Sequence, residues 1–201
     1  MDLSNIDTIL FDLGGVLIDW NPRYVFRQIY DTEEEVEHFL AHICTPEWNE
    51  QQDAGRSLAE ATTSLILQYP AYADPIRAYY SRWSEMLGGP IEGTVALLDQ
   101  LKREERYQLY ALTNWSAETF PIAQERYAFL QWFAGILVSG VEKMKKPQPE
   151  IYHLALERFG LVADRTLFVD DSLRNVEGAR AVGIPAYHFQ GPAALREVLG
   201  Y

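Results

Sequence analysis

The sequence predicts an α/β fold: a parallel sheet with helices on both faces, and an all-helical segment inserted after the first strand. Two observations support this. Short apolar runs of strand length alternate with helical patterns along most of the chain, and between residues 20 and 88 only helix signals occur. Strands that alternate with helices pair in parallel, because each helix carries the chain back across the sheet. At 201 residues, the chain has the length of one domain, or of one core with a modest insertion.

The elements of the core follow from these patterns in chain order. The strands are expected at residues 8–11, 107–112, 135–138, 166–169 and 185–189. The helices between them are indicated by apolar residues at helical spacing: Val95, Leu98 and Leu101; Ile151, Leu154, Ala155 and Phe159, with Gly160 as a stop; Val176 and Ala179, with Gly183 as a stop.

The inserted segment shows three helix starts. Thr32 with Glu35, and Ser57 with Glu60, have the spacing of a capping box. A third helix is expected to start at Asp74, with an apolar stripe of Ile76, Tyr79, Tyr80, Trp83 and Leu87. We therefore expect three helices in this segment and no strand.

The division into domains follows from the extent of that segment. Residues 1–18 and 91–201 are expected to form the α/β core, and residues 19–90 a helical cap that closes over the carboxyl edge of the sheet. Gly88-Gly89-Pro90 is expected to be the flexible end of the cap.

Charge and cysteine content exclude several kinds of partner. The chain has 17 Lys and Arg against 29 Asp and Glu, a net charge of −12, which disfavours nucleic acid and anionic membrane surfaces. Its one cysteine, Cys44, has no internal disulfide partner, and no Cys/His cluster offers a zinc site. With no leader pattern and no apolar stretch of membrane-spanning length, we expect a cytoplasmic protein that binds a small molecule. The oligomeric state cannot be read from the sequence.

Polar groups of different kinds follow four of the predicted strands. They are Asp12 in Asp-Leu-Gly-Gly, the pair Thr113-Asn114, Lys146 just before Pro147, and the pair Asp170-Asp171. Each has an ordinary alternative: a strand exit, a capped loop, a solvated basic cluster and a surface turn, respectively. In a parallel sheet, however, all four strand ends face the same edge. A nucleophilic carboxylate, hydroxyl and amide donors, a lysine and paired acids for a divalent cation together suit metal-assisted phosphoryl transfer.

On these motifs the sequence resembles the haloacid dehalogenase-like (HAD) superfamily of hydrolases, in particular its small phosphatase-like members with a helical cap. The resemblance covers essentially the whole chain, with the four motifs in family order. It implies a Rossmann-like sheet of order 3-2-1-4-5, numbered within the core, and hydrolysis of a small phosphorylated metabolite through an aspartyl-phosphate.

The resemblance also implies a role for each motif. Asp12 would be the nucleophile, and Thr113 and Asn114 would hold the phosphoryl oxygens. Lys146 would bridge the nucleophile and the phosphate. Mg²⁺ would be held by Asp12, the backbone carbonyl of Gly14 and Asp171, with Asp170 in support; Asn175 matches a supporting polar position.

Gly14 departs from the family pattern. Most of the family's phosphatases carry a second Asp at this position, which protonates the leaving oxygen and activates water. Such a group is worth roughly 10²- to 10⁴-fold in rate, so either another group supplies it or turnover is slow. Asp19, His and Glu residues of the cap, and water remain open as substitutes.

Particular residues separate three alternative functions. A 2-haloacid dehalogenase would carry Tyr in place of Gly14 and would lack the acid pair. A phosphonate-cleaving relative needs a cap lysine, and residues 20–90 contain no lysine. A low-activity or non-catalytic protein that binds a phosphorylated ligand is kept open by Gly14.

Substrate choice is expected to lie in the cap. The segment Trp48–Arg56 combines an aromatic residue, amides, acids and an Arg, which would suit a sugar phosphate. The alternative is a polar surface loop with Trp48 tucked into the cap.

Overall fold

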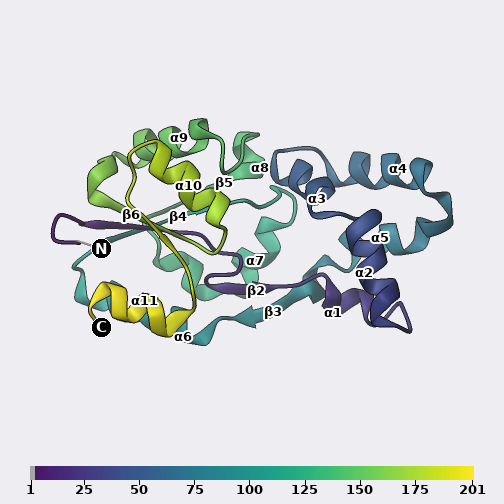
Figure 1. Cartoon of the computed structure of the whole chain (residues 1–201), viewed down its shortest axis with the longest axis horizontal. Helices are drawn as coiled ribbons and strands as arrows, with labels where there is room; N and C mark the ends of the chain where they lie inside the picture. Colours follow the sequence, from purple (N-terminus) through teal and green to yellow (C-terminus); the bar gives the residue numbers. More distant parts are fainter. Residues whose placement is uncertain (1–2) are drawn as a thin grey trace.

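The computed structural model describes residues 3–201 and contains a five-stranded parallel sheet (Figure 1). Its strands are β1 (Thr8–Phe11), β4 (Gln108–Thr113), β5 (Gly135–Val138), β6 (Thr166–Asp170) and β7 (Ala186–His188). Their order is β5-β4-β1-β6-β7, and every neighbouring pair is parallel. This order confirms the predicted 3-2-1-4-5 arrangement.

The central strand β1 is buried on both faces, so its side chains feed two separate apolar clusters. Ile9 and Phe11 point to one side of the sheet and Leu10 points to the other, as the two-residue period of a strand requires. Helices on both sides complete these clusters (Figure 1).

The core helices differ in which cluster they complete. They are α6 (Glu92–Glu104), α7 (Phe120–Arg126), α8 (Ser139–Glu142), α9 (Pro149–Phe159), α10 (Leu173–Ala181) and α11 (Pro192–Leu199). Helices α6 and α11 supply leucines on the side of Ile9 and Phe11, and α9 and α10 pack on the side of Leu10. Gly160 ends α9 in a left-handed conformation with φ of 65°, which confirms the predicted stop.

Between β1 and α6 the chain builds a second lobe beside the sheet (Figure 1). Its helices are α1 (Arg23–Phe26), α2 (Glu33–His42), α3 (Pro46–Asp53), α4 (Leu58–Gln68) and α5 (Ala73–Ser81). The capping box of Thr32 and Glu35 at α2 is confirmed, whereas α4 has only the Ser57 half of one. Helix α5 begins one residue before Asp74 and ends at Ser81, earlier than the predicted stripe.

The lobe joins the sheet through a short antiparallel ribbon that the sequence analysis missed. Strand β2 (Ile18–Trp20) pairs with β3 (Leu87–Pro90), so Gly88-Gly89-Pro90 is a strand and not a flexible end. A Cβ at Gly88 would lie 2.1 Å from Asp19 Oδ2, so a side chain would not fit there. Gly88 therefore allows close contact between the strands, whereas Gly89 supplies a positive φ of 124°. A ribbon this short and glycine-rich shows no apolar alternation.

Residues 46–53 form helix α3, so the segment that starts at Trp48 begins inside a helix and not in a loop. Thr45 caps the helix through a hydrogen bond from the Trp48 backbone N–H, and Pro46 occupies its first turn. Trp48 is buried, which accords with the tucked-in alternative. Across residues 3–201, no helix combines the length and apolar character needed to cross a membrane.

Candidate active site

The predicted site residues meet at the carboxyl edge of the sheet, because β1, β4 and β6 all end there. Asp12 follows β1, Thr113 ends β4, and Asp170 ends β6. Lys146 reaches the same place from the loop before α9. Its ammonium Nζ lies 3.0 Å from Asp12 Oδ1 and 2.6 Å from Asp170 Oδ2, so residues far apart in sequence form one charged cluster.

Lys146 is completely buried and works as an internal counter-ion. Its Nζ also donates to the Leu112 carbonyl at 3.0 Å, so all three ammonium protons have acceptors. Burial by itself lowers the pKa of Lys146, but the facing carboxylates of Asp12 and Asp170 outweigh it and raise that pKa. The lysine therefore stays charged.

The side chain of Asn114 holds the backbone of Lys146 in place. Its Oδ1 accepts from the Lys146 backbone N–H at 2.9 Å, and its Nδ2 donates to the Lys146 carbonyl at 3.0 Å. The neighbouring Thr113 hydroxyl is buried and has no hydrogen-bond partner within residues 3–201. A buried hydroxyl without a partner is costly, so Thr113 suits an acceptor supplied by a bound ligand.

The carboxylate of Asp12 lies near more negative charge than Lys146 alone can neutralise. Its Oδ1 accepts from the Leu13 backbone N–H at 2.7 Å. Burial raises the pKa of Asp12 to about 8; Asp170 and Asp171 add to the rise, and Lys146 opposes it. Ligand atoms of Asp12, Asp170 and Asp171 lie within 4.8 Å of one another.

The two adjacent acids, Asp170 and Asp171, differ in burial and in hydrogen bonding. Asp170 is fully buried: its oxygens accept from Lys146, from Asn175 Nδ2 at 3.1 Å and from the Ser172 backbone N–H at 2.8 Å. Asp171 is exposed and lines the cleft beside Asp12. The oxygen donors of Asp12, Asp170 and Asp171 suit a hard divalent cation.

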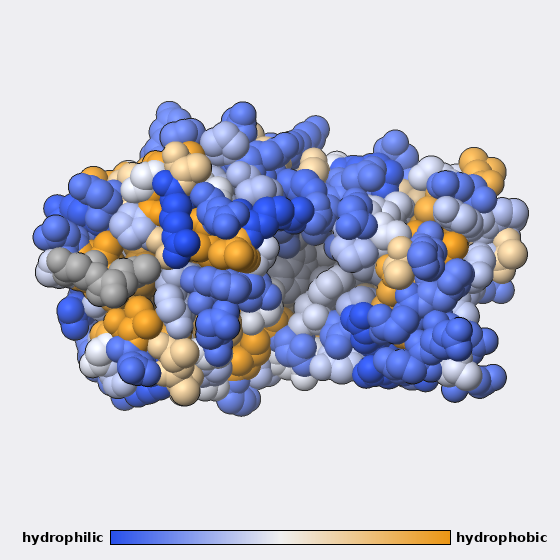
Figure 2. Space-filling model, in the orientation of Figure 1, coloured by the Kyte–Doolittle hydropathy of each residue, from blue (hydrophilic) through white to orange (hydrophobic). Residues whose placement is uncertain are grey.

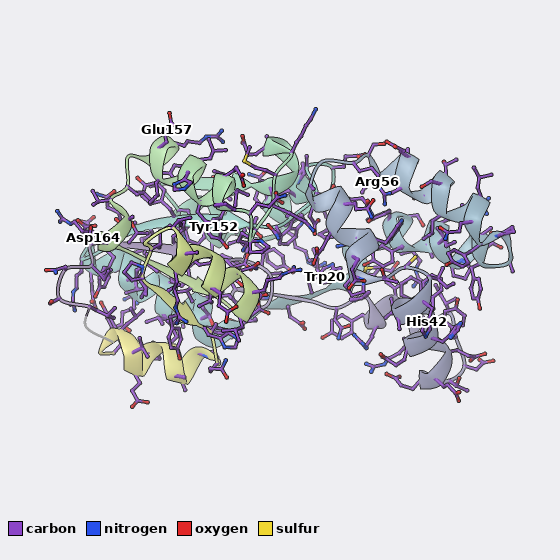
Figure 3. All side chains as sticks on the ribbon, turned by 45° about the horizontal axis from the view of Figure 1, so that its top comes forward. Trp20, His42, Arg56, Tyr152, Glu157 and Asp164 are labelled. Carbon is purple, nitrogen blue, oxygen red and sulfur yellow. The ribbon has the colours of Figure 1, made fainter. Side chains whose placement is uncertain are left out.

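A cleft of about 820 Å³ opens over this edge, between the sheet and the helical lobe. Figure 2 shows the molecule hollowed between its two lobes. Gly14, Gly15 and Asn114 line it from the core, with Glu50 and Asp53 among the residues from the lobe. Aromatic side chains also line the cleft: Trp20, Tyr79, Tyr80, Trp83 and Trp115. Trp20 lies at the junction of the lobes (Figure 3).

Asp53 is the residue whose position the sequence analysis did not anticipate. It ends α3 and lines the cleft together with Asn114, and its Oδ2 accepts from Asn49 Nδ2 at 3.4 Å. Its carbonyl accepts from Ser139 Oγ at 2.5 Å. The sequence placed Asp53 only in the polar segment Trp48–Arg56, which suggested ligand binding. Its contact with Ser139 joins residues far apart in sequence and could not be read from that segment.

The fold and site define a hydrolase with a buried carboxylate poised beside a lysine and an acid pair. The family model described as haloacid dehalogenase-like hydrolase matches residues 6–183. The chain belongs to the haloacid dehalogenase-like hydrolases.

Named relatives match nearly the whole chain. The sesquiterpene phosphatase astK of Aspergillus oryzae is 30% identical over 195 residues, covering 95% of each chain. The GMP/IMP nucleotidase YrfG of Escherichia coli is 25% identical, covering 90% of this chain and 81% of its own. The magnesium complex of a HAD family enzyme from Bacteroides thetaiotaomicron has the same fold, with a TM-score of 0.76 at 22% identity, over 98% of this chain and 100% of that one.

Proposed function

We propose that this protein is a Mg²⁺-dependent phosphatase that hydrolyses the phosphoric monoester of a small metabolite through an aspartyl-phosphate on Asp12. The observation that carries the proposal is the cluster of Asp12, Lys146, Asp170 and Asp171 at the base of the cleft. The names of relatives such as the sesquiterpene phosphatase and the nucleotidase support the same reaction class. The bound magnesium in the structural neighbour supports the choice of cation.

Each side chain has a defined task in this proposal. The ionised Asp12 attacks phosphorus, and the charge of Lys146 holds the carboxylate and offsets the charge of the phosphate. Thr113 donates its free hydroxyl to a phosphoryl oxygen, and Asn114 contributes by fixing Lys146. Asp12, the Gly14 carbonyl and Asp171 hold the cation, which neutralises developing negative charge when bound.

The helical lobe, residues 19–90, is proposed to act as a cap on the core formed by residues 1–18 and 91–201. Acid and amide side chains of α3 line the cleft, and so do the aromatic side chains of Trp20, Tyr79, Tyr80 and Trp83, so the cap would select the alcohol part of the substrate. A sugar phosphate would suit the polar side chains of α3, and the phosphate of an apolar alcohol would suit the aromatic side chains. A panel of both kinds, assayed with and without Mg²⁺, identifies the preferred class.

The decisive experiment replaces the nucleophile. Asp12→Asn should abolish phosphate release and acid-stable trapping of phosphoenzyme, while circular dichroism and oligomeric state stay unchanged. The control is Asp74→Asn, an aspartate on α5 that does not line the cleft. Near-normal phosphate release by Asp12→Asn would rule out the mechanism. Tight binding of a phosphate ester by the wild type without turnover would instead favour a binding protein.

A further inference from the structure

The carboxylates around the cleft differ in whether they can donate and accept a proton. Gly14 carries no side chain, so a phosphatase reaction here needs a proton donor from elsewhere. The acids that line the cleft are Asp12, Glu37, Glu47, Glu50, Asp53 and Asp171. Asp12 and Asp171 are already assigned to the nucleophile and cation positions.

Two of the remaining acids are held as carboxylates by arginine or lysine. Glu37 receives two hydrogen bonds from Arg23, at 2.5 Å and 2.7 Å. Glu50 is paired with Lys145, and with Arg174 at 2.6 Å. The bond from Arg23 lowers the pKa of Glu37, and for Glu50 the two cations outweigh burial and lower its pKa. Neither keeps a proton near neutral pH.

Of the substitutes suggested by the sequence, Asp19 and the histidines do not line the cleft. Asp19 accepts a hydrogen bond from the Tyr24 hydroxyl and does not line the cleft. None of the histidines lines it either, and Figure 3 places His42 on the helical lobe. Glu47 lies in the first turn of α3 and is exposed, at the opposite end of that helix from Asp53. Asp53 is therefore the remaining candidate.

Asp53 is anchored to the loop that follows β4, although it belongs to the helical lobe. Its carboxylate Oδ2 accepts from Asn49 Nδ2 at 3.4 Å. Ser139 Oγ donates to its carbonyl and accepts from the Trp115 backbone N–H at 2.9 Å. Asn114, in the same loop, lines the cleft together with Asp12 and Asp53. These bonds fix the end of α3 against the core, so the Asp53 carboxyl has a defined place in the cleft wall.

The surroundings of Asp53 favour a carboxyl that both holds and releases a proton near neutral pH. It is half-buried and forms no ion pair within residues 3–201. Burial is the main cause that raises the pKa of Asp53 to about 7, and Glu50 adds to the rise. Lys145, the Ser116 N–H and Lys146 act in the opposite direction. A pKa close to the working pH is what an acid-base catalyst needs.

We propose that Asp53 is the general acid and base of this site, in the role that Gly14 cannot perform. The inference rests on the proposed phosphatase reaction. In the first step an Asp12 oxygen bonds to phosphorus, the bond from phosphorus to the leaving oxygen breaks, and that oxygen takes the Asp53 proton to leave as an alcohol. In the second step the Asp53 carboxylate takes a proton from water as the water oxygen bonds to phosphorus. The bond from phosphorus to Asp12 then breaks, releasing inorganic phosphate and restoring both carboxyl groups.

The test compares Asp53→Asn with the wild type on two substrates. Hexyl phosphate needs its leaving oxygen protonated, whereas p-nitrophenyl phosphate does not. Asp53→Asn should lower kcat/KM for hexyl phosphate by about 10²- to 10⁴-fold. With p-nitrophenyl phosphate it should release one equivalent of nitrophenolate in a burst, followed by slow turnover, because water is no longer activated. Asp53→Glu should recover part of the activity, and Asp74→Asn is the control.

The pH profile gives a second readout that a structural role would not move. In the wild type at saturating Mg²⁺, which keeps the Asp12 carboxylate ionised, phosphoenzyme formation from hexyl phosphate should fall as the pH rises through about 7, because Asp53 loses its proton. Asp53→Asn should lack this limb. Equal losses on both substrates, without a burst and with the limb retained, would overturn the role of Asp53. If no phosphoenzyme forms in the wild type while Asp12→Asn stays active, the proposed function itself fails.

Discussion

The most direct test of the cation site is a single methyl group at Gly15. This glycine has a φ of 72°, and a Cβ there would lie 2.1 Å from Asp171 Oδ2. Gly160 has a φ of 65° and nothing within 4 Å of its Cβ position. Gly15→Ala and Gly160→Ala therefore impose similar backbone strain, and only the first pushes on Asp171.

The size of each effect follows from these geometries. A left-handed backbone costs a non-glycine residue about 1–2 kcal/mol, which for a chain of this length lowers Tm by about 2–8 °C. Ordinary van der Waals contact begins at 3.4 Å, so the Asp171 carboxylate must move by roughly 1 Å or more to admit the methyl group. Mg²⁺ tolerates little distortion, and a displacement of that size costs about 10²-fold in rate.

The assay measures Tm by calorimetry and activity as a function of Mg²⁺ concentration for both variants. We expect similar losses of Tm from the backbone, plus a higher Mg²⁺ requirement and about 10²-fold lower kcat in Gly15→Ala only. Gly160→Ala should keep the wild-type Mg²⁺ titration. The same Mg²⁺ titration in both variants would refute the placement of Asp171 at the cation.

Three further predictions address the rest of the site. Lys146→Met should lower the free energy of unfolding by about 3–5 kcal/mol in denaturant titrations, because it leaves two buried carboxylates without their counter-ion; a loss below about 1 kcal/mol would contradict this. The increase in Tm caused by saturating Mg²⁺ should grow between about pH 6 and pH 8.5. The reason is that the raised pKa of Asp12 stabilises the cation-free fold at low pH, and this stabilisation is lost as the pH rises through about 8. An increase in Tm that is independent of pH would count against Asp12 as a ligand. Gly14→Asp should restore hexyl phosphate hydrolysis to Asp53→Asn by up to about 10²-fold, since a Cβ at Gly14 meets nothing within 4 Å; no recovery in a folded, Mg²⁺-binding double variant would contradict a shared proton-transfer role.

The order of the sheet and the meeting of the four motifs followed from the sequence, because both depend on one rule. Parallel strands end at a common edge, so residues that follow β1, β4 and β6 must lie near one another. The runs around Ile9, Leu109 and Leu167 were long and apolar enough to be recognised one by one. The capping box at Thr32 could also be predicted, because it is a local sequence pattern.

The ribbon of β2 and β3 was not readable, because its strands are held by pairing with each other and not by local preference. Gly88 and Gly89 have the composition of a flexible turn, and only the pairing with β2 makes them part of a strand. Helix α3 was missed for a related reason: it is polar along most of its length and has few buried residues. Its place is set by packing against the core and by the cap at Thr45.

The free acid in the cleft was decided by tertiary structure alone. The sequence shows Glu50 and Asp53 three positions apart on one polar segment and offers no reason to tell them apart. In the fold, Lys145 and Arg174 come from distant parts of the chain to pair with Glu50. Asp53 accepts from Asn49 Nδ2 at 3.4 Å, forms no ion pair within residues 3–201 and lies in a partly buried environment. The sequence by itself determined which chemical groups reach the edge of the sheet, because strand direction is local. Which carboxylate keeps its proton depends on the charges that folding places around it.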